Sequence, residues 1–379
     1  MKKVRLGIIG ATGLVGTIIL RILQEQNFPI QDLRLFASAN STDRIIHYAS
    51  SQLEKDLRVE DLNTQNADTV KNLDIAIFSA GATVSKKWAP VFAQAGVVVI
   101  DNSSAWRSDP RIPLVVSEVN PKDVRWALAT GGKHIIANPN CTTMAMMPIL
   151  ATLNQHYKLN SIIVSTYQAV SGAGQKGVNE LASQAESMLN DGVNLLLKGT
   201  AFPMIKPDVF AAPIAFNVLP YAGNFLEDNS GETDEERKLR DESRKILHLA
   251  KLKVAGTCVR VPVFTGHSLS VNAVFQNNLT PRDVIEILTK TSGVSLTNRL
   301  TSRYFTRAQD MDIATSPASA FPTPLLAVGH DPVYIGRIRQ DLSRNDQKGI
   351  NFFAVCDNLR KGAALNAIEL AKIVMKYLS

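Results

Sequence analysis

The sequence predicts an α/β protein: an N-terminal domain built on a parallel sheet, followed by an α+β domain with a mixed sheet. Two observations carry this prediction. Over residues 4–100, short apolar runs alternate with segments of helical period, which is typical of parallel strands joined by crossover helices. After about Ser161 the apolar runs follow one another without a long helix between them. We place the boundary between the two domains near residue 140.

The first domain, residues 1–140, begins with a strand at Val4–Ile9, a glycine turn and a helix at Leu14–Gln24. Its other elements are strands at Leu33–Ala37, Asp74–Ser79, Val97–Ile100 and Ile135–Ala137, and a helix at Ser85–Ala95. This alternation of strands and helices predicts a nucleotide-binding, Rossmann-like sheet.

The second domain is predicted to span residues 141–355, with loops over Asn190–Asn224. A hydroxyl at Thr233 followed by Glu236 forms a capping box and predicts a helix that runs to about Ala250. The expected strands lie at Ser161–Gln168, Gly256–Phe264 and Leu269–Phe275. Residues 356–379 are expected to form a helix, with one apolar face, that returns to the first domain.

Composition excludes several classes of protein. Three scattered cysteines are too few for a disulfide framework and suit a reducing compartment, so we expect the cytoplasm. The net charge of +7 is not clustered, so no nucleic-acid partner is expected. No apolar run is long enough to span a membrane, and no histidines stand at a metal-ligand spacing, so neither a membrane nor a metal is expected.

The glycines at Gly10, Gly13 and Gly16 follow a strand and open a helix. They let the backbone approach a diphosphate, which the helix N terminus attracts. A tight turn without a ligand is the alternative interpretation. Because no carboxylate follows the strand Leu33–Ala37, NADP is favoured over NAD. The polar residues expected near its 2′-phosphate are Ser38, Asn40, Ser41 and Arg44.

Cys141 follows a strand and an Asn-Pro-Asn turn, where a helical pattern begins. The positive end of a helix dipole stabilises a thiolate, so Cys141 is the candidate nucleophile, and Asn140 can donate to a developing oxyanion. Cys258 and Cys356 instead lie within apolar strands and are expected to be buried and inert. A thiol next to a nicotinamide site points to aldehyde chemistry.

Seven blocks of residues, in order along nearly the whole chain, resemble the aspartate-β-semialdehyde dehydrogenase family. They are Ser79-Ala-Gly81, Asp101-Asn-Ser-Ser-Ala-Trp-Arg107, Pro113-Leu-Val-Val-Ser-Glu-Val-Asn120, Ile136-Ala-Asn-Pro-Asn-Cys141, Ser165-Thr-Tyr-Gln-Ala-Val-Ser-Gly-Ala-Gly174, Arg260-Val-Pro-Val-Phe-Thr-Gly-His267 and Asp357-Asn-Leu-Arg-Lys-Gly-Ala-Ala364. The resemblance implies reversible, phosphate-dependent and NADP-dependent conversion of L-aspartyl-4-phosphate to L-aspartate-4-semialdehyde. That step serves the biosynthesis of lysine, diaminopimelate, threonine and methionine. The resemblance also implies a homodimer.

The resemblance assigns roles to individual residues. Cys141 matches the nucleophile that forms a thioester, His267 the general acid/base, and Gln168 the residue that positions the substrate. The remaining matches are Arg260 and Glu235 for the carboxylate and amino group of the substrate, Arg107 and Lys238 for its phosphate, and Thr12, Gly13, Leu14, Val15, Ser171, Gly172 and Asn358 for the cofactor.

One position departs from the family pattern. Where the family commonly has an arginine that holds the 2′-phosphate, this chain has Asn40, which leaves NAD as an alternative cofactor. Two other functions stay open at this point. One is the N-acetyl-glutamyl-phosphate reductase reaction, which shares the thioester chemistry, and the other is a catalytically silent nucleotide-binding scaffold. Gln168 and the helix with Glu235 and Lys238 favour the aspartyl substrate.

Overall fold

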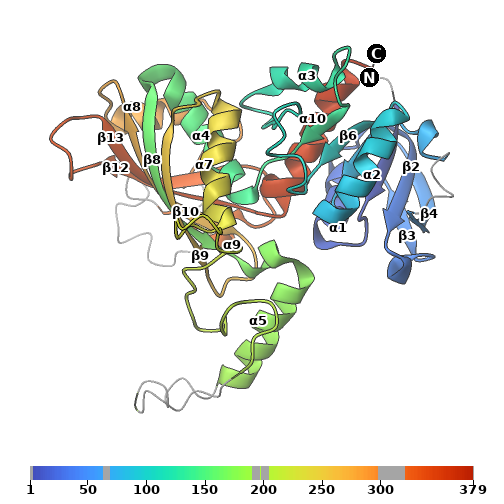
Figure 1. Cartoon of the computed structure of the whole chain (residues 1–379), viewed down its shortest axis with the longest axis horizontal. Coiled ribbons are helices and arrows are strands. Elements are labelled where there is room, and N and C mark those ends of the chain that lie inside the picture. Colours follow the sequence, from blue (N-terminus) through green and yellow to red (C-terminus); the bar gives the residue numbers. More distant parts are fainter. Residues whose placement is uncertain (1–2, 63–68, 190–196, 198–204, 298–320, 379) are drawn as a thin grey trace. The chain divides into compact units, whose positions relative to one another are not determined.

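The computed structural model describes residues 3–62, 69–189, 197, 205–297 and 321–378 (Figure 1). The chain divides into two compact units. The first contains Met1–Ala151, Asp241–Lys251 and Leu359–Ser379, and the second contains Thr152–Arg240 and Leu252–Asn358. Each unit is built around its own β-sheet. The sequence did not predict that Asp241–Lys251 belongs to the first unit.

The sheet of the first unit has the order β3-β4-β2-β1-β5-β6-β7 within the described residues. Its neighbours pair in parallel, except β3 with β4, which confirms the predicted Rossmann-like parallel sheet. The strands are β1 (Val4–Ile9), β2 (Ile30–Ala37), β3 (Ile45–Ala49), β4 (Glu54–Asp61), β5 (Ile75–Phe78), β6 (Val98–Asp101) and β7 (Ile135–Ala137). The helices are α1 (Leu14–Glu25), α2 (Ala82–Gln94), α3 (Val124–Leu128) and the start of α4 (Cys141–Tyr157).

The hairpin of β3 and β4 was not predicted from the sequence. In β4 only Leu57 and Val59 are buried, because its other side chains are polar and lie toward solvent or at the margin of the sheet. The strand therefore shows little of the apolar pattern on which strand prediction depends. It nevertheless pairs in parallel with β2, so both strands end at the same edge of the sheet.

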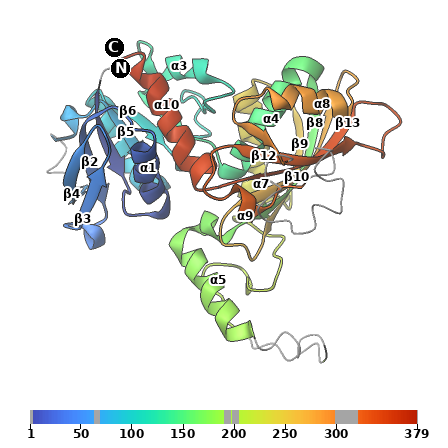
Figure 2. The ribbon, with the colours of Figure 1, turned by 180° about the vertical axis from the view of Figure 1, so that it is seen from behind.

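The C-terminal segment contributes to the core of the first unit. It begins with a π-helical turn at Arg360–Leu365 and continues as α10 (Asn366–Met375), rather than as one regular helix. Its buried residues belong to the same apolar cluster as those of β1 and α1. Figure 2 shows α10 alongside α1. The apolar face predicted for this segment is thus the face that packs.

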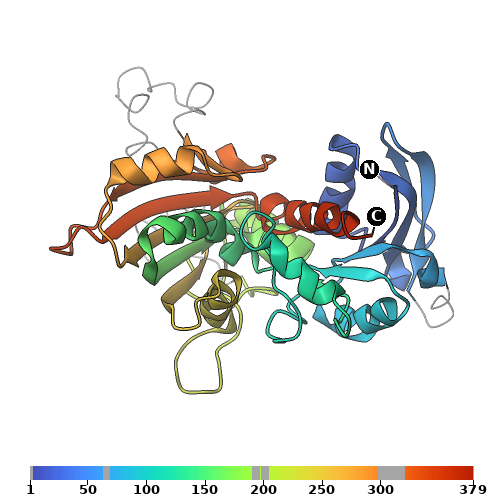
Figure 3. The same ribbon diagram turned by 90° about the horizontal axis from the view of Figure 1, so that it is seen from above.

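The sheet of the second unit has the order β11-β12-β13-β10-β8-β9 in the described part of the chain. It is mixed, as predicted, because β8 with β9 and β11 with β12 pair in parallel and the others antiparallel. Its strands are β8 (Leu159–Gln168), β9 (Lys253–Arg260), β10 (His267–Phe275), β11 (Val294–Leu296), β12 (Val333–Gln340) and β13 (Gly349–Cys356). Figure 3 shows α8 (Pro281–Thr289) lying along this sheet, and the other helices are α5 (Gly174–Met188) and α9 (Pro324–Ala327).

Two elements end several residues before their predicted ends. Strand β9 ends at Arg260 instead of Phe264, because Pro262 has no N–H with which to continue the ladder. Helix α7 (Asp234–Leu247) has the predicted capping box, with Thr233 and Glu236 bonded reciprocally, but ends before Ala250. The loops expected over Asn190–Asn224 are found at 205–224, and most of the rest lies outside the described residues. In the ranges that are described, no helix combines the length and apolarity needed to cross a membrane.

Candidate active site

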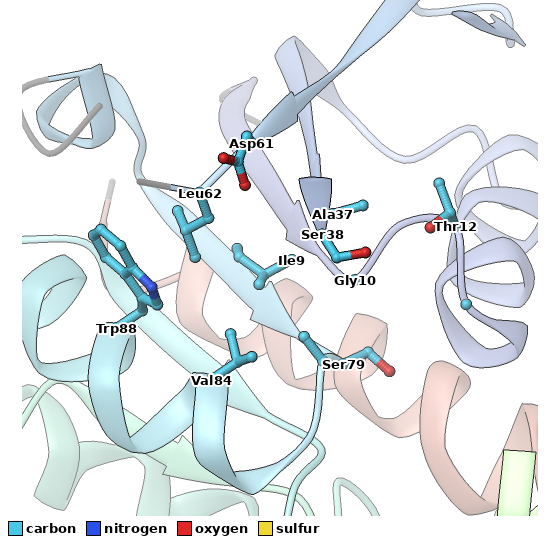
Figure 4. Close-up of a pocket in the computed structure, with 12 residues that line it drawn as sticks. Ile9, Gly10, Thr12, Ala37, Ser38, Asp61, Leu62, Ser79, Val84 and Trp88 are labelled. Atoms are coloured by element: carbon cyan, nitrogen blue, oxygen red, sulfur yellow. The ribbon is translucent and has the colours of Figure 1, made fainter. Parts of the chain in front are cut away.

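A cleft of about 420 Å³ lies at the carboxyl ends of the parallel strands in the first unit (Figure 4). This edge is where parallel α/β sheets bind ligands. The described lining residues come from the ends of β1, β2, β4 and β5 and from α2. They are Ile9, Gly10, Thr12, Gly13, Ala37, Ser38, Asp61, Leu62, Ser79, Ala80, Val84 and Trp88.

The glycine turn at this edge fits a dinucleotide diphosphate. Gly10 has a φ of +87°, and a Cβ there would lie 2.5 Å from the carbonyl oxygen of Ser79. A Cβ on Gly16 would lie 2.2 Å from the carbonyl oxygen of Gly10, so both positions require glycine. Gly13 is the exposed N-cap of α1, and no side chain of the described residues caps that terminus. The first backbone N–H groups of α1 therefore suit an anion.

The structure divides the predicted cofactor residues of the first unit into two groups. Gly10, Thr12, Gly13 and Ser38 line the cleft. The described lining does not include the other predicted residues. These are Leu14, Val15 and Gly16 at the start of α1, Asn40 and Ser41 in a 3₁₀ turn at Ala39–Ser41, and Arg44, which is exposed. Asp61 and Leu62 line the cleft and were missed because β4 was not predicted, and Trp88 on α2 was missed as well.

Cys141 is the first residue of α4, as the sequence predicts. The Oδ1 of Asn140 accepts the backbone N–H of Thr142 at 3.1 Å and the hydroxyl of Thr142 at 3.0 Å, which caps the helix. The same oxygen lies 3.4 Å from the Sγ of Cys141. Cys141 is partly exposed, whereas Cys258 and Cys356 are buried, and burial raises the pKa of Cys258 to about 12. Only Cys141 is therefore both accessible and at a helix N terminus.

Glu242 on α7 holds the turn before Cys141, and sequence reasoning missed it. It is 4% exposed, and its carboxylate accepts the backbone N–H of Asn140 at 2.7 Å and pairs with Arg107 at 3.3 Å. The guanidinium also donates to the carbonyl oxygens of Asn138 at 2.9 Å and Asn102 at 2.7 Å. Arg107 is thus fixed beside the nucleophile turn. Glu242 could not be found from periodicity, since α7 has charged residues on most of its positions.

The C-terminal segment holds the other side of this turn. The side-chain amide of Asn138 donates to the carbonyl oxygen of Ala363 at 3.2 Å, and its oxygen accepts from Asn366. Lys361, which is 0% exposed, pairs with Glu118 and anchors the segment. Residues far apart in sequence therefore fix the backbone that leads to Cys141.

In the second unit, three predicted residues meet at one edge of the sheet. Gln168 at the end of β8 is the register partner of Arg260 at the end of β9. His267 begins β10, which runs antiparallel to β8, so His267 also lies at this edge. The guanidinium of Arg260 donates to the carbonyl oxygen of Ala169 at 3.0 Å. The pairing of β8, β9 and β10 thus assembles residues that are separated by about a hundred positions in sequence.

Gln168 also connects to the helix that carries Glu235 and Lys238. Its Nε2 donates to Glu235 at 3.0 Å, while its buried Oε1 has no hydrogen-bond partner among the described residues. A buried polar atom without a partner is costly and indicates a place for a ligand. Lys238 donates to Asp234 at 2.7 Å and Glu235 at 3.2 Å. Although burial opposes it, these two carboxylates raise the pKa of Lys238, so the amine is charged.

His267 is fully buried, and its hydrogen bond defines its tautomer. The Nδ1 accepts the backbone N–H of Ala169 at 3.0 Å, so the neutral ring has its proton on Nε2. Burial and, to a lesser extent, the charge of Arg260 lower the pKa of His267 to about 3. The imidazole is therefore neutral near pH 7. An anion bound to Arg260 would offset the effect of the Arg260 charge and raise the pKa of His267.

This low pKa predicts a pH-dependent loss of stability. Between pH 6.5 and 3 the unfolded chain binds a proton at His267 that the folded chain does not, so the free energy of unfolding falls as the pH drops below about 6.5. His267→Asn keeps an acceptor for Ala169. By urea denaturation we expect this variant to lose about 2 kcal/mol less than the wild type between pH 7.5 and pH 5. The exposed His156, changed to Asn, is the control and should behave like the wild type. Equal losses in all three proteins would contradict the buried neutral ring.

Three of the predicted cofactor residues also meet in the second unit. The side-chain amide of Asn358 donates to the hydroxyl of Ser171 at 2.9 Å, and its oxygen accepts the backbone N–H of Gly266 at 2.8 Å. A Cβ on Gly172 would lie 2.9 Å from Arg260 and 3.2 Å from His267. Glycine at this position therefore keeps the backbone close to both side chains.

Comparisons with known proteins agree with this arrangement. Residues 5–127 match a family model described as semialdehyde dehydrogenase, NAD binding domain, and residues 150–361 match semialdehyde dehydrogenase, dimerisation domain. Aspartate-semialdehyde dehydrogenases from Streptomyces akiyoshiensis and Corynebacterium glutamicum are 49% and 46% identical to this chain. The first match covers 98% of each chain, and the second covers 98% of this chain and 99% of the relative.

A solved structure extends the likeness to the fold. The crystal structure of aspartate semialdehyde dehydrogenase II from Vibrio cholerae has a TM-score of 0.84 at 38% identity and covers 99% of both chains. The same enzyme has been solved in complex with ASA. The relatives, the family models and this structure span nearly the whole sequence. The chain therefore belongs to the aspartate-semialdehyde dehydrogenase family of oxidoreductases.

Proposed function

We propose that the chain catalyses the reversible reductive dephosphorylation of L-aspartyl-4-phosphate to L-aspartate-4-semialdehyde through a thioester on Cys141. The step would serve lysine, diaminopimelate, threonine and methionine biosynthesis. The observation that carries the proposal is the sheet edge where Gln168, Arg260 and His267 meet, where the buried Oε1 of Gln168 has no partner within the described part of the chain. A relative at 37% identity whose structure contains ASA supports the choice of substrate.

Cys141 performs the covalent chemistry in this proposal. Its thiolate, favoured by the N terminus of α4, attacks the acyl carbon; the carbon–oxygen bond breaks and inorganic phosphate leaves. Asn140 and the backbone N–H groups at the start of α4 are the proposed donors to the oxyanion. Arg107 and Lys238, both held as cations, bind the phosphate.

The sheet edge of the second unit orients the amino-acid part of the substrate. Arg260 binds the α-carboxylate and Glu235 binds the amino group, while Gln168 positions the acyl group. An anion on Arg260 would offset the smaller of the two causes that lower the pKa of His267, so substrate binding would favour protonation of the ring. In the proposed step the protonated ring of His267 gives a proton to the oxygen of the intermediate and becomes neutral, and the neutral ring takes a proton back as the aldehyde leaves.

The residues present fit a nicotinamide dinucleotide. We propose NADP as the cofactor, with NAD as an alternative because Asn40 cannot offer paired charges to a 2′-phosphate. When bound, the reduced cofactor supplies a hydride to the thioester carbon. Gly10, Thr12, Gly13, Leu14, Val15 and Gly16 form the diphosphate turn, Ser38, Asn40 and Ser41 follow β2, and Ser171, Gly172 and Asn358 lie in the second unit.

We further propose that the enzyme works as a homodimer in the cytoplasm. The match of residues 150–361 to a dimerisation domain supports the dimer. All three cysteines are free thiols, which suits a reducing compartment.

An absorbance assay tests the reaction. The purified chain is mixed with aspartate semialdehyde and NADP or NAD, with and without inorganic phosphate. We expect cofactor reduction that depends on phosphate, since phosphate must release the acyl group from Cys141. No reduction by folded protein with a reduced Cys141 would contradict the proposal. Reduction with N-acetyl-glutamate semialdehyde alone would favour the related reductase.

A further inference from the structure

The loop that carries Arg107 follows β6 and has no regular secondary structure. It runs from Asn102 to Asp109 and belongs to no helix or strand. Its start is fixed at Asp101, the buried last residue of β6, whose carboxylate accepts the backbone N–H of Ser103 at 3.0 Å and the hydroxyl of Ser103 at 2.7 Å. A loop without a ladder of backbone bonds depends on side chains from other elements to keep its shape.

The guanidinium of Arg107 is anchored by three hydrogen bonds. It donates to the carbonyl oxygens of Asn138 at 2.9 Å and Asn102 at 2.7 Å, and to the carboxylate of Glu242 at 3.3 Å. A guanidinium has five N–H groups, so within the described part of the chain two are left for a ligand. An anion with paired oxygens, such as phosphate, can accept from both when the guanidinium has the right direction.

Lys245 on α7 holds the main chain of the same residue. Its Nζ donates to the backbone carbonyl oxygen of Arg107 at 2.9 Å and to that of Asp109 at 2.7 Å. Burial lowers the pKa of Lys245, while the charges of Asp109 and Glu242 oppose this shift. Glu242 stands three residues before Lys245, on the same side of the helix. One side of α7 therefore holds both the side chain and the main chain of Arg107.

The bonds from Lys245 fix the point from which the side chain of Arg107 starts. Without them the carbonyl oxygens of Arg107 and Asp109 would turn to water, and the loop could shift by a fraction of an ångström. A binding group must keep its geometry within about 0.5 Å to be effective. A small shift of the loop would therefore weaken the paired contact with phosphate, although the charge of Arg107 remains.

We infer that Lys245 is a positioning residue that sets the affinity for phosphate by holding the main chain of Arg107. The inference rests on the proposed function, in which Arg107 binds the phosphate of the substrate. In this role Lys245 acts through Arg107 without touching the substrate. Its loss is therefore expected to change the KM for phosphate and to leave the aldehyde and dinucleotide sites unchanged.

Steady-state kinetics of aspartate semialdehyde oxidation test this role, with urea denaturation to verify that each variant is folded. Lys245→Met removes the amine and keeps an apolar stem. We expect the KM for inorganic phosphate to rise about tenfold, while kcat at saturating phosphate and the KM for aspartate semialdehyde stay within about twofold. Lys245→Gln keeps an N–H donor on a shorter side chain and should raise the KM for phosphate by less. Lys245→Arg keeps the charge and the donors and should restore most of the affinity.

A second background separates positioning from plain attraction between charges. Arg107→Lys replaces the planar fork by a flexible point charge, which depends less on the place of the main chain. In this background Lys245→Met should raise the KM for phosphate by only about twofold. Attraction between Lys245 and phosphate would instead raise the KM about tenfold in both backgrounds, and this result would overturn the inference.

Lys251→Met is the matched control. Lys251 is exposed and lies shortly after the end of α7, so its loss should leave the KM for phosphate unchanged. A KM for phosphate within about twofold of the wild-type value in folded Lys245→Met would overturn the role of Lys245 alone. Equal rises in the KM values for phosphate and aldehyde would also overturn it, since they indicate a general defect of the fold. A wild type without phosphate-dependent reduction would contradict the proposed function, and the inference with it.

Discussion

Cys141→Ala is expected to abolish turnover, by about a thousandfold or more, while dinucleotide binding stays intact. The substitution removes the sulfur that would form the thioester. It leaves Asn140 free to cap α4 through Thr142, so the turn and the helix should keep their structure. The cofactor cleft lies at the ends of β1, β2, β4 and β5 and contains no atom of Cys141. The assay is phosphate-dependent cofactor reduction, together with calorimetric titration of the dinucleotide.

Cys258→Ala provides the control for this experiment. Cys258 is buried and its pKa is raised to about 12, so its thiol is not a nucleophile at neutral pH. This variant should keep its activity and lose only some stability through the small cavity left behind. Turnover that survives in Cys141→Ala would exclude the covalent mechanism. Loss of dinucleotide binding along with turnover would instead indicate a folding defect.

Glu242→Ala is expected to lower the free energy of unfolding by about 3 kcal/mol and to reduce turnover strongly. The substitution leaves the buried N–H of Asn140 and the guanidinium of Arg107 without their carboxylate. The loss of the bond to Asn140 loosens the backbone next to Cys141. The loss of the bond to Arg107 removes the carboxylate that balances the charge of this guanidinium beside the turn. Urea denaturation measures the stability, and the phosphate-dependent assay measures turnover and the KM for phosphate.

Two further variants separate the causes. Glu242→Gln keeps an acceptor for Asn140 but not the negative charge, so we expect a smaller loss of stability and a changed KM for phosphate. Glu286→Ala removes a carboxylate whose pair with Lys290 is solvent-exposed, and should cost well under about 1 kcal/mol. If Glu242→Ala is as harmless as Glu286→Ala, the network around the nucleophile turn does not stabilise the fold.

Local patterns were sufficient to predict much of the first unit. β1 and the start of α1 could be predicted because an apolar run, a glycine that needs a positive φ and a helical period follow one another directly. Cys141 could be placed at a helix N terminus for the same reason. β4 could not be predicted, since only Leu57 and Val59 of that strand are buried, and Asp61 was missed with it.

The partners of the site residues could not be predicted from local patterns at all. Gln168 and Arg260 become neighbours only through the register of β8 with β9. Glu242 lies on a helix whose composition indicates a solvated face, yet tertiary packing buries it against the nucleophile turn. The resemblance to the family identified Gln168, Arg260 and His267 without giving the strand pairing that brings them together. The tautomer of His267 likewise depends on a backbone N–H that only the folded sheet supplies.

The bonds from Asn138 to Ala363 and Asn366 also set an order of events during synthesis. They join positions more than 220 residues apart, so residues 363–366 must leave the ribosome before the nucleophile turn can be completed. Until then the turn that leads to Cys141 lacks the hydrogen bonds of Asn138 to Ala363 and Asn366. A nascent or truncated chain would therefore contain the nucleophile without the geometry that activates it. Truncation before residue 363 would remove both bonds and leave the turn before Cys141 without this support.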